Sequence, residues 1–242
     1  MKISLVALAG VLGEFGDRQG DARPLEEHSP EWPKHIYMTY ANLGRVPSYV
    51  HLALNRYARD YTVSWFDDSD CLDFMRQESP SALEAYRAMP NGAHRADMWR
   101  YHILRKRGGV YLDTDIVLKR PLDEVFPDRR MAYTVLSKGA SAIFNAVLVS
   151  PPGNPIFDTL ISQMVKTVLS GGGYTYDVFT QQFYTSLMRQ PRATRRGWVL
   201  FQERCGSSDP CDGRLDKYGL CCGVYGLDGS LLMGSRYPDF PF

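Results

Sequence analysis

The chain has 242 residues, a formal net charge of +1 and a hydrophobic content of 44%. This composition is that of a globular protein and excludes a wholly disordered chain. The near-zero net charge provides no overall field that would favour nucleic acid or an anionic membrane surface as a partner. The length suits one α/β domain, and we expect residues 33–242 to form it.

Residues 1–32 lack the pattern of a folded segment. The mostly apolar run at 3–13 resembles the core of a signal peptide, but it has no clear small-residue cleavage site. It is also shorter than the roughly 20 residues of a membrane span. Residues 13–33 are rich in Gly, Pro and charged side chains without apolar periodicity. We predict a leader and linker at 1–32, with cleavage left open and at most weak membrane association.

Four of the five cysteines lie near the end of the chain, at Cys205, Cys211, Cys221 and Cys222. Their spacing lacks the paired C-x-x-C knuckles of structural zinc sites, so disulfides and reduced thiols are the two balanced interpretations. The lumen of the secretory pathway, such as the Golgi, is slightly favoured over the cytoplasm, which stays the alternative.

A strand, helix and strand open the predicted domain. Residues 35–40 are dense in β-branched and aromatic side chains, 47–60 carry apolar residues at helical intervals, and 61–66 again suit a strand. Such a crossover implies a parallel pair of strands, with Asp67 and Asp68 at the carboxyl edge where ligands bind in α/β folds. A helix cap before residues 72–77 is the favoured alternative for these carboxylates.

The next predicted elements are helices at 81–89 and 93–107, ended by Gly108 and Gly109 before a buried strand at 110–112. Asp97, Arg100 and Tyr101 are spaced i, i+3 and i+4, so they share one face of the second helix. On spacing alone, an intrahelical ion pair between Asp97 and Arg100 explains the pattern, and such a pair contributes a few tenths of a kcal/mol.

After the aspartates at 113 and 115, we expect the strand to continue briefly over 116–118 and to end at Pro121. Further strands are predicted at 131–136 and 142–149, and helices at 155–169 and 177–188, before short apolar pieces from residue 198 onward. Asn145 interrupts the second of these strands. Its amide is equally suited to bind a ligand or to cap backbone groups.

The aspartates at 113 and 115 follow an apolar strand and are one residue apart. Two carboxylates this close repel each other unless a cation lies between them, and oxygen ligands suit Mg²⁺ or Mn²⁺. A magnesium-like ion with few protein ligands completes its shell with water and substrate phosphates. The pattern therefore favours a nucleoside diphosphate beside the metal, although a lone D-x-D is a weak signal.

The surrounding residues resemble glycosyltransferase family 32, which includes fungal initiating mannosyltransferases, lactosylceramide galactosyltransferases and bacterial capsular-polysaccharide enzymes. The resemblance is carried by Ala93, Asp97, Arg100, Tyr101, Leu104, the sequence GGVYLDTD at 108–115, Pro121 and Leu122. A weaker similarity covers 33–40, where Tyr37 and Tyr40 replace a His and a Trp of the family. The resemblance extends over about residues 33–150.

This resemblance implies an α/β fold of the GT-A type, with a mixed, mostly parallel sheet between helices. It implies a retaining hexosyltransferase that uses Mn²⁺ or Mg²⁺, a UDP- or GDP-hexose donor and a glycan or glycolipid acceptor. Asp115 would bind the metal with Asp113, which would also contact the ribose or a metal-bound water. The other donor-site residues implied are Tyr40, which would stack on the base, Asp97, Arg100, Tyr101, Tyr111 and Asn145.

Two other functions are kept as alternatives. The first is a sugar-nucleotide or glycan binding module without catalysis, because the C-terminal part lacks the family's His- and Trp-containing motif. The second is a haloacid-dehalogenase-type phosphotransferase, in which Asp113 would be the nucleophile and Asp115 the acid or base. No later metal loop with the sequence G-D-x-x-x-D supports that second alternative.

Overall fold

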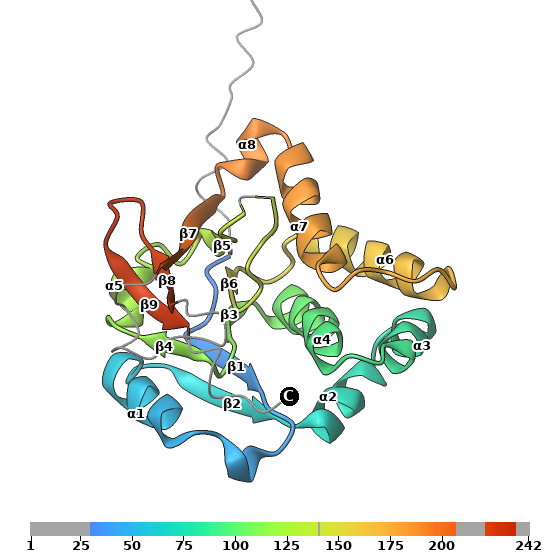
Figure 1. The fold of residues 1–242 in the computed structure, drawn as a ribbon, viewed down its shortest axis with the longest axis horizontal. Coiled ribbons are helices and arrows are strands. Elements are labelled where there is room, and N and C mark those ends of the chain that lie inside the picture. The colour runs from blue at the N-terminus through green and yellow to red at the C-terminus, as the bar shows by residue number, and fades with distance from the viewer. Residues whose placement is uncertain (1–29, 140, 207–220, 236–242) are drawn as a thin grey trace, which may run out of the picture.

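The computed structural model describes residues 30–139, 141–206 and 221–235, which form one curled mixed sheet flanked by helices (Figure 1). The strand order is β2-β1-β3-β6-β5-β7-β8-β9-β4. The strands are β1 His35–Thr39, β2 Thr62–Phe66, β3 Gly109–Leu112, β4 Ile116–Leu118, β5 Ala132–Leu136, β6 Val147–Ser150, β7 Trp198–Gly206, β8 Cys221–Tyr225 and β9 Leu231–Ser235.

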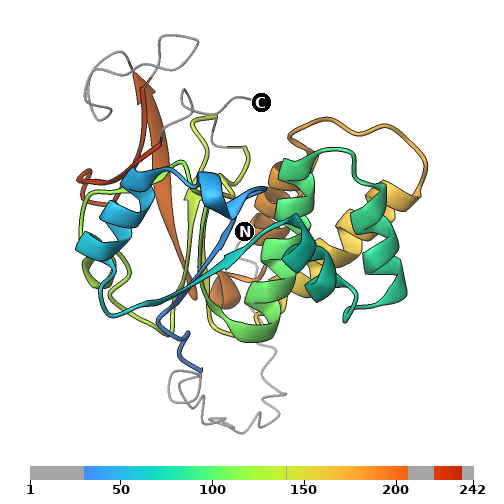
Figure 2. The same ribbon diagram turned by 90° about the horizontal axis from the view of Figure 1, so that it is seen from below.

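The helices cover both faces of this sheet (Figure 2). They are α1 Ser48–Tyr57, α2 Asp68–Met75, α3 Pro80–Ala88, α4 Gly92–Arg107, α5 Leu122–Val125, α6 Ile156–Leu169, α7 Val178–Arg189 and α8 Arg192–Arg195, with a 3-10 turn at Leu43–Arg45. Helices α2, α3, α4, α6 and α7 share one apolar core, whereas α1 and α5 belong to a second core across the sheet. No helix among these described residues is apolar over the length that a bilayer requires.

The predicted α/β architecture is confirmed, but the balance of strand directions differs from the prediction. Strand β1 is parallel to β2 and β3, and β5 is parallel to β7, whereas the other described pairings are antiparallel. Parallel neighbours require a crossover, while antiparallel neighbours can be joined by a tight turn such as the one at Gly226 to Gly229 between β8 and β9. With three parallel and five antiparallel pairings among the described strands, the sheet is mixed and mainly antiparallel.

Strands β3 and β4 are separate elements, although the sequence suggested one strand that continues past the aspartates. β3 lies inside the sheet between β1 and β6, while β4 pairs with β9 at its far edge. The curl of the sheet brings the two together, because Leu112 of β3 and Ile116 of β4 belong to the same apolar core. Asp113 and Asp115 therefore lie in the short turn where the chain leaves one strand and enters the other.

The folded part includes Trp32, which the sequence analysis placed in the linker. Trp32 is fully buried, its backbone N–H donates to the Arg129 carbonyl at 2.9 Å, and its indole N–H donates to the Met131 carbonyl at 3.1 Å. Its ring also stacks near Tyr61 at 6.4 Å. An aromatic side chain followed by Pro, in a polar stretch, gave no periodic signal, and only the long-range contacts reveal its burial. Residues 1–29 lie outside the described residues.

Candidate functional site

Helix α4 carries Asp97, Arg100 and Tyr101, and local interactions define both of its ends. Asn91 caps the first turn, with its side-chain oxygen accepting from the Ala93 N–H at 2.8 Å. Gly108 ends the helix at a φ of 62°, and a Cβ there would lie 2.6 Å from the Pro152 backbone nitrogen. The chain therefore turns directly from α4 into β3 and the aspartates that follow it.

Asp97, Arg100 and Tyr101 of α4 meet Asn145, the residue two positions before β6, in a buried hydrogen-bond network. The Asn145 amide nitrogen donates to an Asp97 carboxylate oxygen at 3.0 Å and to the Tyr101 hydroxyl at 2.7 Å. The Arg100 guanidinium donates to the Asn145 carbonyl at 2.5 Å and lies 3.5 Å from the Asp97 carboxylate. The network joins α4 to the segment before β6.

The same guanidinium reaches Asp113. An Arg100 nitrogen lies 3.3 Å from the Asp113 Oδ1, and the guanidinium carbon lies 4.3 Å from the centre of the Tyr111 ring. The Tyr111 hydroxyl donates to the same Asp113 oxygen at 2.7 Å, and lies 3.0 Å from the Thr39 hydroxyl of β1. Arg100 is thus fixed between two carboxylates and the ring of an aromatic side chain.

Burial and charge set the protonation states of the network. Burial acts to lower the pKa of Arg100, but the Asp113 and Asp97 carboxylates outweigh it and the pKa is raised, so the guanidinium stays charged. Burial raises the pKa of Asp97, against the opposing effect of Arg100 and the Asn145 hydrogen bond. The pKa of Tyr101 and that of Tyr111 are both raised well above 10, mainly by burial, so both phenols remain neutral.

Asp115 has a different environment from Asp113. Its Oδ1 atom is buried and has no hydrogen-bond partner among the residues that the structure describes. Burial, and then the charge of Asp113, raise the pKa of Asp115 to about 7. A carboxylate oxygen that is buried, unpartnered and repelled by its neighbour is suited to an incoming cation. Oxygen ligands of this kind fit Mg²⁺ or Mn²⁺, with Asp115 and Asp113 as the candidate ligands.

A cleft of about 380 Å³ opens on Arg100 and Asp113. Its walls come from the end of β1, the first turn of α2, the last turn of α3 and the first turns of α4. The lining residues are Thr39, Tyr40, Ala41, Asp68, Cys71, Tyr86, Gly92, Ala93, Arg95, Ala96, Arg100 and Asp113. The cleft is of the size that holds a small ligand, and it reaches Asp113, the first of the two carboxylates.

Comparison with known proteins agrees with this geometry. Residues 44–132 match the family model described as "Glycosyltransferase sugar-binding region containing DXD motif". This segment is therefore similar to the sugar-binding region of DXD glycosyltransferases. It contains α4, β3 and Asp113 and Asp115, and Asn145 lies after its end.

The relatives of this sugar-binding region include fungal mannosyltransferases. The chain is 31% identical to a mannosyl phosphorylinositol ceramide synthase of Saccharomyces cerevisiae over 105 residues, which is 43% of this chain and 27% of that protein. It is 32% identical to the initiation-specific alpha-1,6-mannosyltransferase of Candida albicans over 122 residues, 45% of this chain and 30% of that protein. The matches thus span under a third of these relatives.

Among solved structures, the PaToxG glycosyltransferase matches with a TM-score of 0.49 and 17% identity, over 64% of this chain and 70% of that chain.

Two predicted donor contacts are corrected by the structure. Tyr101 and Tyr111 are both 0% exposed, so neither ring offers a surface to a donor. Each phenol instead holds a neighbouring polar group, Asn145 for Tyr101 and Asp113 for Tyr111. Sequence spacing placed Tyr101 on the same helix face as Asp97 and Arg100, but could not show that its ring packs against Phe157 of α6 and Phe183 of α7. Tyr40 is half-buried and lines the cleft, where stacking on a base stays a prediction.

The sequence left two interpretations for Asp67 and Asp68, a helix cap or a position facing a ligand, and the two residues differ in the structure. Asp67 caps α2, because its carboxylate accepts from the Ser69 and Asp70 N–H groups at 2.8 and 2.9 Å, which confirms the favoured interpretation. Asp68 lines the cleft and lies 3.7 Å from Arg95.

Sequence reasoning missed Arg95 and Thr39 as cleft residues. Arg95 belongs to no sequence motif, and its spacing from Arg100 places it off the helix face that carries Asp97 and Arg100. Thr39 is one of several β-branched residues of the first strand, and only its pairing with the Tyr111 hydroxyl distinguishes it. No pattern in a single sequence identifies either residue as part of the cleft.

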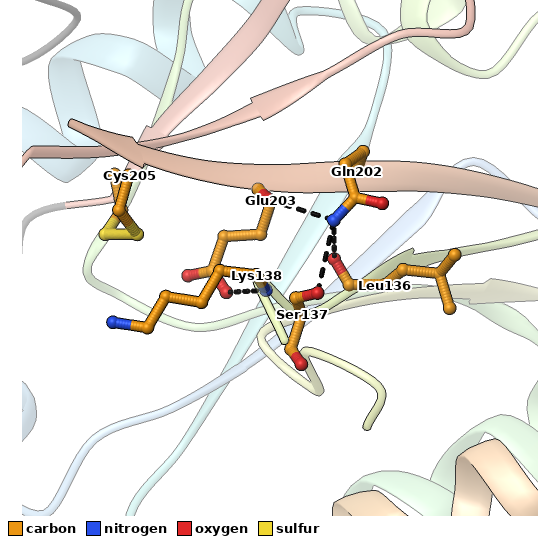
Figure 3. Close-up of a disulfide and its surroundings, with 7 residues drawn as sticks. Leu136, Ser137, Lys138, Gln202, Glu203 and Cys205 are labelled. Carbon is orange, nitrogen blue, oxygen red and sulfur yellow. Dashed lines mark hydrogen bonds between the residues drawn. A yellow bond between two sulfur atoms is a disulfide. The ribbon is translucent and has the colours of Figure 1, made fainter. Parts of the chain in front are cut away.

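Strand β7 supports the segment that leads to Asn145 (Figure 3). The buried Glu203 carboxylate accepts from the Lys138 backbone N–H at 3.1 Å, and the Gln202 amide donates to the Leu136 and Ser137 carbonyls at 3.3 and 3.1 Å. Two residues further along β7, Cys205 is disulfide-bonded to Cys222 of β8. The disulfide interpretation is therefore realised for this pair, while Cys211 lies outside the described residues.

Proposed function

We propose that this chain transfers a hexose from a nucleoside-diphosphate sugar to a hydroxyl group of a glycan or glycolipid, with a divalent cation. The observation that carries the proposal is the cleft that reaches Arg100 and Asp113, with the unpartnered carboxylate oxygen of Asp115 two residues further along the chain, in a segment that matches a DXD sugar-binding family model. Mannose is the first candidate for the hexose, because several relatives are named mannosyltransferases. UDP and GDP are both retained as carriers.

Asp115 and Asp113 would hold the cation, Mn²⁺ or Mg²⁺, and the cleft would hold the donor. A bound cation would neutralise the negative charge that develops on the diphosphate leaving group. Asp113 is already oriented by Tyr111 and Arg100, so its carboxylate needs little rearrangement to act as a ligand. This preorganisation favours the transition state, because no conformational cost arises during the reaction.

Arg100 contributes a fixed positive charge at the wall of the cleft. Its donors are held by the Ala96 and Asn145 carbonyls and by the carboxylates of Asp97 and Asp113. A guanidinium held in this way cannot swing toward solvent, and it keeps its charge at all pH values where the fold survives. We propose that Asp97 binds a hydroxyl of the donor sugar and orients Arg100. Retention of anomeric configuration is proposed from the family resemblance.

The test is metal-dependent ligand binding by the intact chain and by Asp115→Asn. Nucleoside-diphosphate sugars with Mn²⁺ should raise the melting temperature of the wild-type protein, because a ligand at 100 times its Kd adds about 2.7 kcal/mol to the free energy of unfolding. Asp115→Asn keeps the shape of the side chain but removes the charge that holds the cation. We expect it to abolish this metal-dependent shift and transfer, and to leave the melting temperature without ligand unchanged or higher.

The matched control is Asp73→Asn, at an exposed ion pair with Arg76 on α2. It should retain the full shift. Metal-dependent binding in Asp115→Asn equal to that of the wild type would refute the metal role. Binding without transfer to any sugar or glycolipid acceptor would identify the chain as a binding module, and phosphate release without sugar transfer would favour a phosphotransferase.

A further inference from the structure

The loop between α6 and α7 is attached to helix α4 beside the cleft. The carbonyl of Tyr176 in this loop accepts a hydrogen bond from the His94 Nε2 at 2.9 Å. The ring of Tyr174 packs on His94 at 5.4 Å and on Phe179 at 5.3 Å. His94 directly follows Ala93, which lines the cleft. The loop is thus held against the first turns of α4.

Tyr176 points out of this anchored loop and remains uncovered. It is 62% exposed, although one side of its ring lies 5.2 Å from the His94 ring. His94, on which the ring packs, precedes Asp97 by three residues on α4, so the two share one face of the helix. Partial burial, and then the carboxylates of Asp97 and Asp113, raise the pKa of Tyr176. An exposed aromatic ring, supported from behind, therefore borders the Asp97 side of the site while lying outside the lining of the cleft.

Two buried acceptors, one on the His94 ring behind Tyr176 and one in the network around Asp97, have no donor in the part of the chain that the structure describes. They are the Nδ1 of His94 and the side-chain oxygen of Asn145. Because the His94 Nε2 carries the proton that it donates to Tyr176, its Nδ1 is an acceptor. The Asn145 oxygen is an acceptor because the amide nitrogen faces Asp97.

We propose that Tyr176 is the platform on which the sugar ring of the acceptor stacks. The inference rests on the proposed function, in which the donor occupies the cleft and its sugar lies near Asp97 and Arg100. The acceptor must then approach from outside the cleft on that side, where Tyr176 lies. A tyrosine ring gives a flat apolar surface that matches the C–H face of a hexopyranose, at a low entropic cost because few torsions are fixed.

The experiment measures binding of the methyl glycosides of mannose, galactose and glucose by saturation-transfer NMR. The full chain is first saturated with UDP or GDP, whichever binds it, and Mn²⁺. The variants are Tyr176→Ala, Tyr176→Phe and, as the control, Leu227→Ala, which removes another exposed apolar side chain that is 81% exposed on the β8–β9 turn. A stacked ring contributes about 0.5–1.5 kcal/mol, so loss of the ring should weaken glycoside binding about three- to tenfold.

We expect Tyr176→Ala to show this loss, and Tyr176→Phe and Leu227→Ala to bind the glycoside as the wild type does. Nucleotide affinity should stay within twofold in all three variants. Equal glycoside binding by Tyr176→Ala and the wild type overturns the inference, as does a wild type that binds nucleotide but none of the glycosides. In both cases the proposed function stands. A wild type that binds neither nucleotide overturns the proposed function and this inference together.

Discussion

At the scale of single residues, the site is defined by what its carboxylates contact. Asp113 accepts from Tyr111 and faces Arg100, whereas Asp115 has a buried oxygen without a partner in the described chain. Two aspartates one residue apart in sequence thus receive different environments. The first is preoriented by the protein, and the second has an oxygen that none of the described side chains contacts through a hydrogen bond.

Removing the Tyr111 hydroxyl tests this preorientation. Tyr111→Phe keeps the ring under Arg100 but removes the hydrogen bond to Asp113. We expect the affinity for a nucleoside-diphosphate sugar with Mn²⁺ to fall about tenfold, which corresponds to about 1.4 kcal/mol, because Asp113 must then be ordered on binding. Isothermal titration calorimetry measures this change.

The matched control is Tyr133→Phe. The Tyr133 hydroxyl donates to the Asp128 carbonyl at 3.0 Å and accepts from the Asp128 N–H at 2.9 Å, so that variant also loses hydrogen bonds of a buried phenol. It should lower the free energy of unfolding by about 1 kcal/mol and leave ligand affinity unchanged. An unaltered affinity in Tyr111→Phe would contradict preorientation by the phenol.

At the scale of elements, the unit that builds the site is helix α4 with the turn into β3. The sequence predicted this helix with its glycine stop, and the structure confirms both. The turn has no space for a side chain at Gly108 or Gly109, since a Cβ would lie 2.6 Å from Pro152 or 2.8 Å from the His35 carbonyl. Because β3 follows α4 so closely, Asp113, directly after β3, lies opposite Arg100 of α4.

Gly108→Ala should therefore destabilise the protein. The added Cβ meets backbone atoms and the φ of 62° is unfavourable for alanine, so we expect a loss of about 2–4 kcal/mol of unfolding free energy. Gly153→Ala provides the control, because its φ is 73° but nothing lies within 4 Å of the new Cβ. It should cost only about 1–2 kcal/mol. Urea unfolding compares them, and equal losses would show that the close contact at Gly108 is unimportant.

At the scale of the whole molecule, the C-terminal strands complete the sheet around the site. β7 holds the loop before Asn145 through Gln202 and Glu203, and β9 receives β4 directly after Asp115. The disulfide between Cys205 and Cys222 joins β7 to β8 within this group of strands. Residues nearly a hundred positions after the D-x-D sequence therefore support its surroundings.

Reduction should weaken this part of the fold. The Cys205–Cys222 bond links residues 17 positions apart, and closing a loop of that size contributes about 3 kcal/mol in the chain-entropy model. We expect dithiothreitol to lower the free energy of unfolding of the wild type by that amount, measured from the urea midpoint. The double variant Cys205→Ala with Cys222→Ala should already be destabilised and should not respond to the reductant. A wild-type midpoint that dithiothreitol leaves unchanged would contradict this role.

The sequence by itself determined the local elements and the donor-side motif. Periodicity located α4 and the strands near it, and the resemblance carried by Asp97, Arg100 and the carboxylates at 113 and 115 predicted a sugar-nucleotide site. These features depend on neighbours within a turn or a strand, so one sequence contains them.

Only the tertiary structure decided which side chains face a ligand. The burial of Tyr101 and Tyr111, the partner of Asn145, the antiparallel C-terminal strands and the separation of β3 from β4 all depend on contacts between distant segments. A pattern of residue types does not specify such contacts, because they form only when the curled sheet brings distant segments together. For this reason the sequence predicted the chemistry of the site, while the curled sheet decided its geometry.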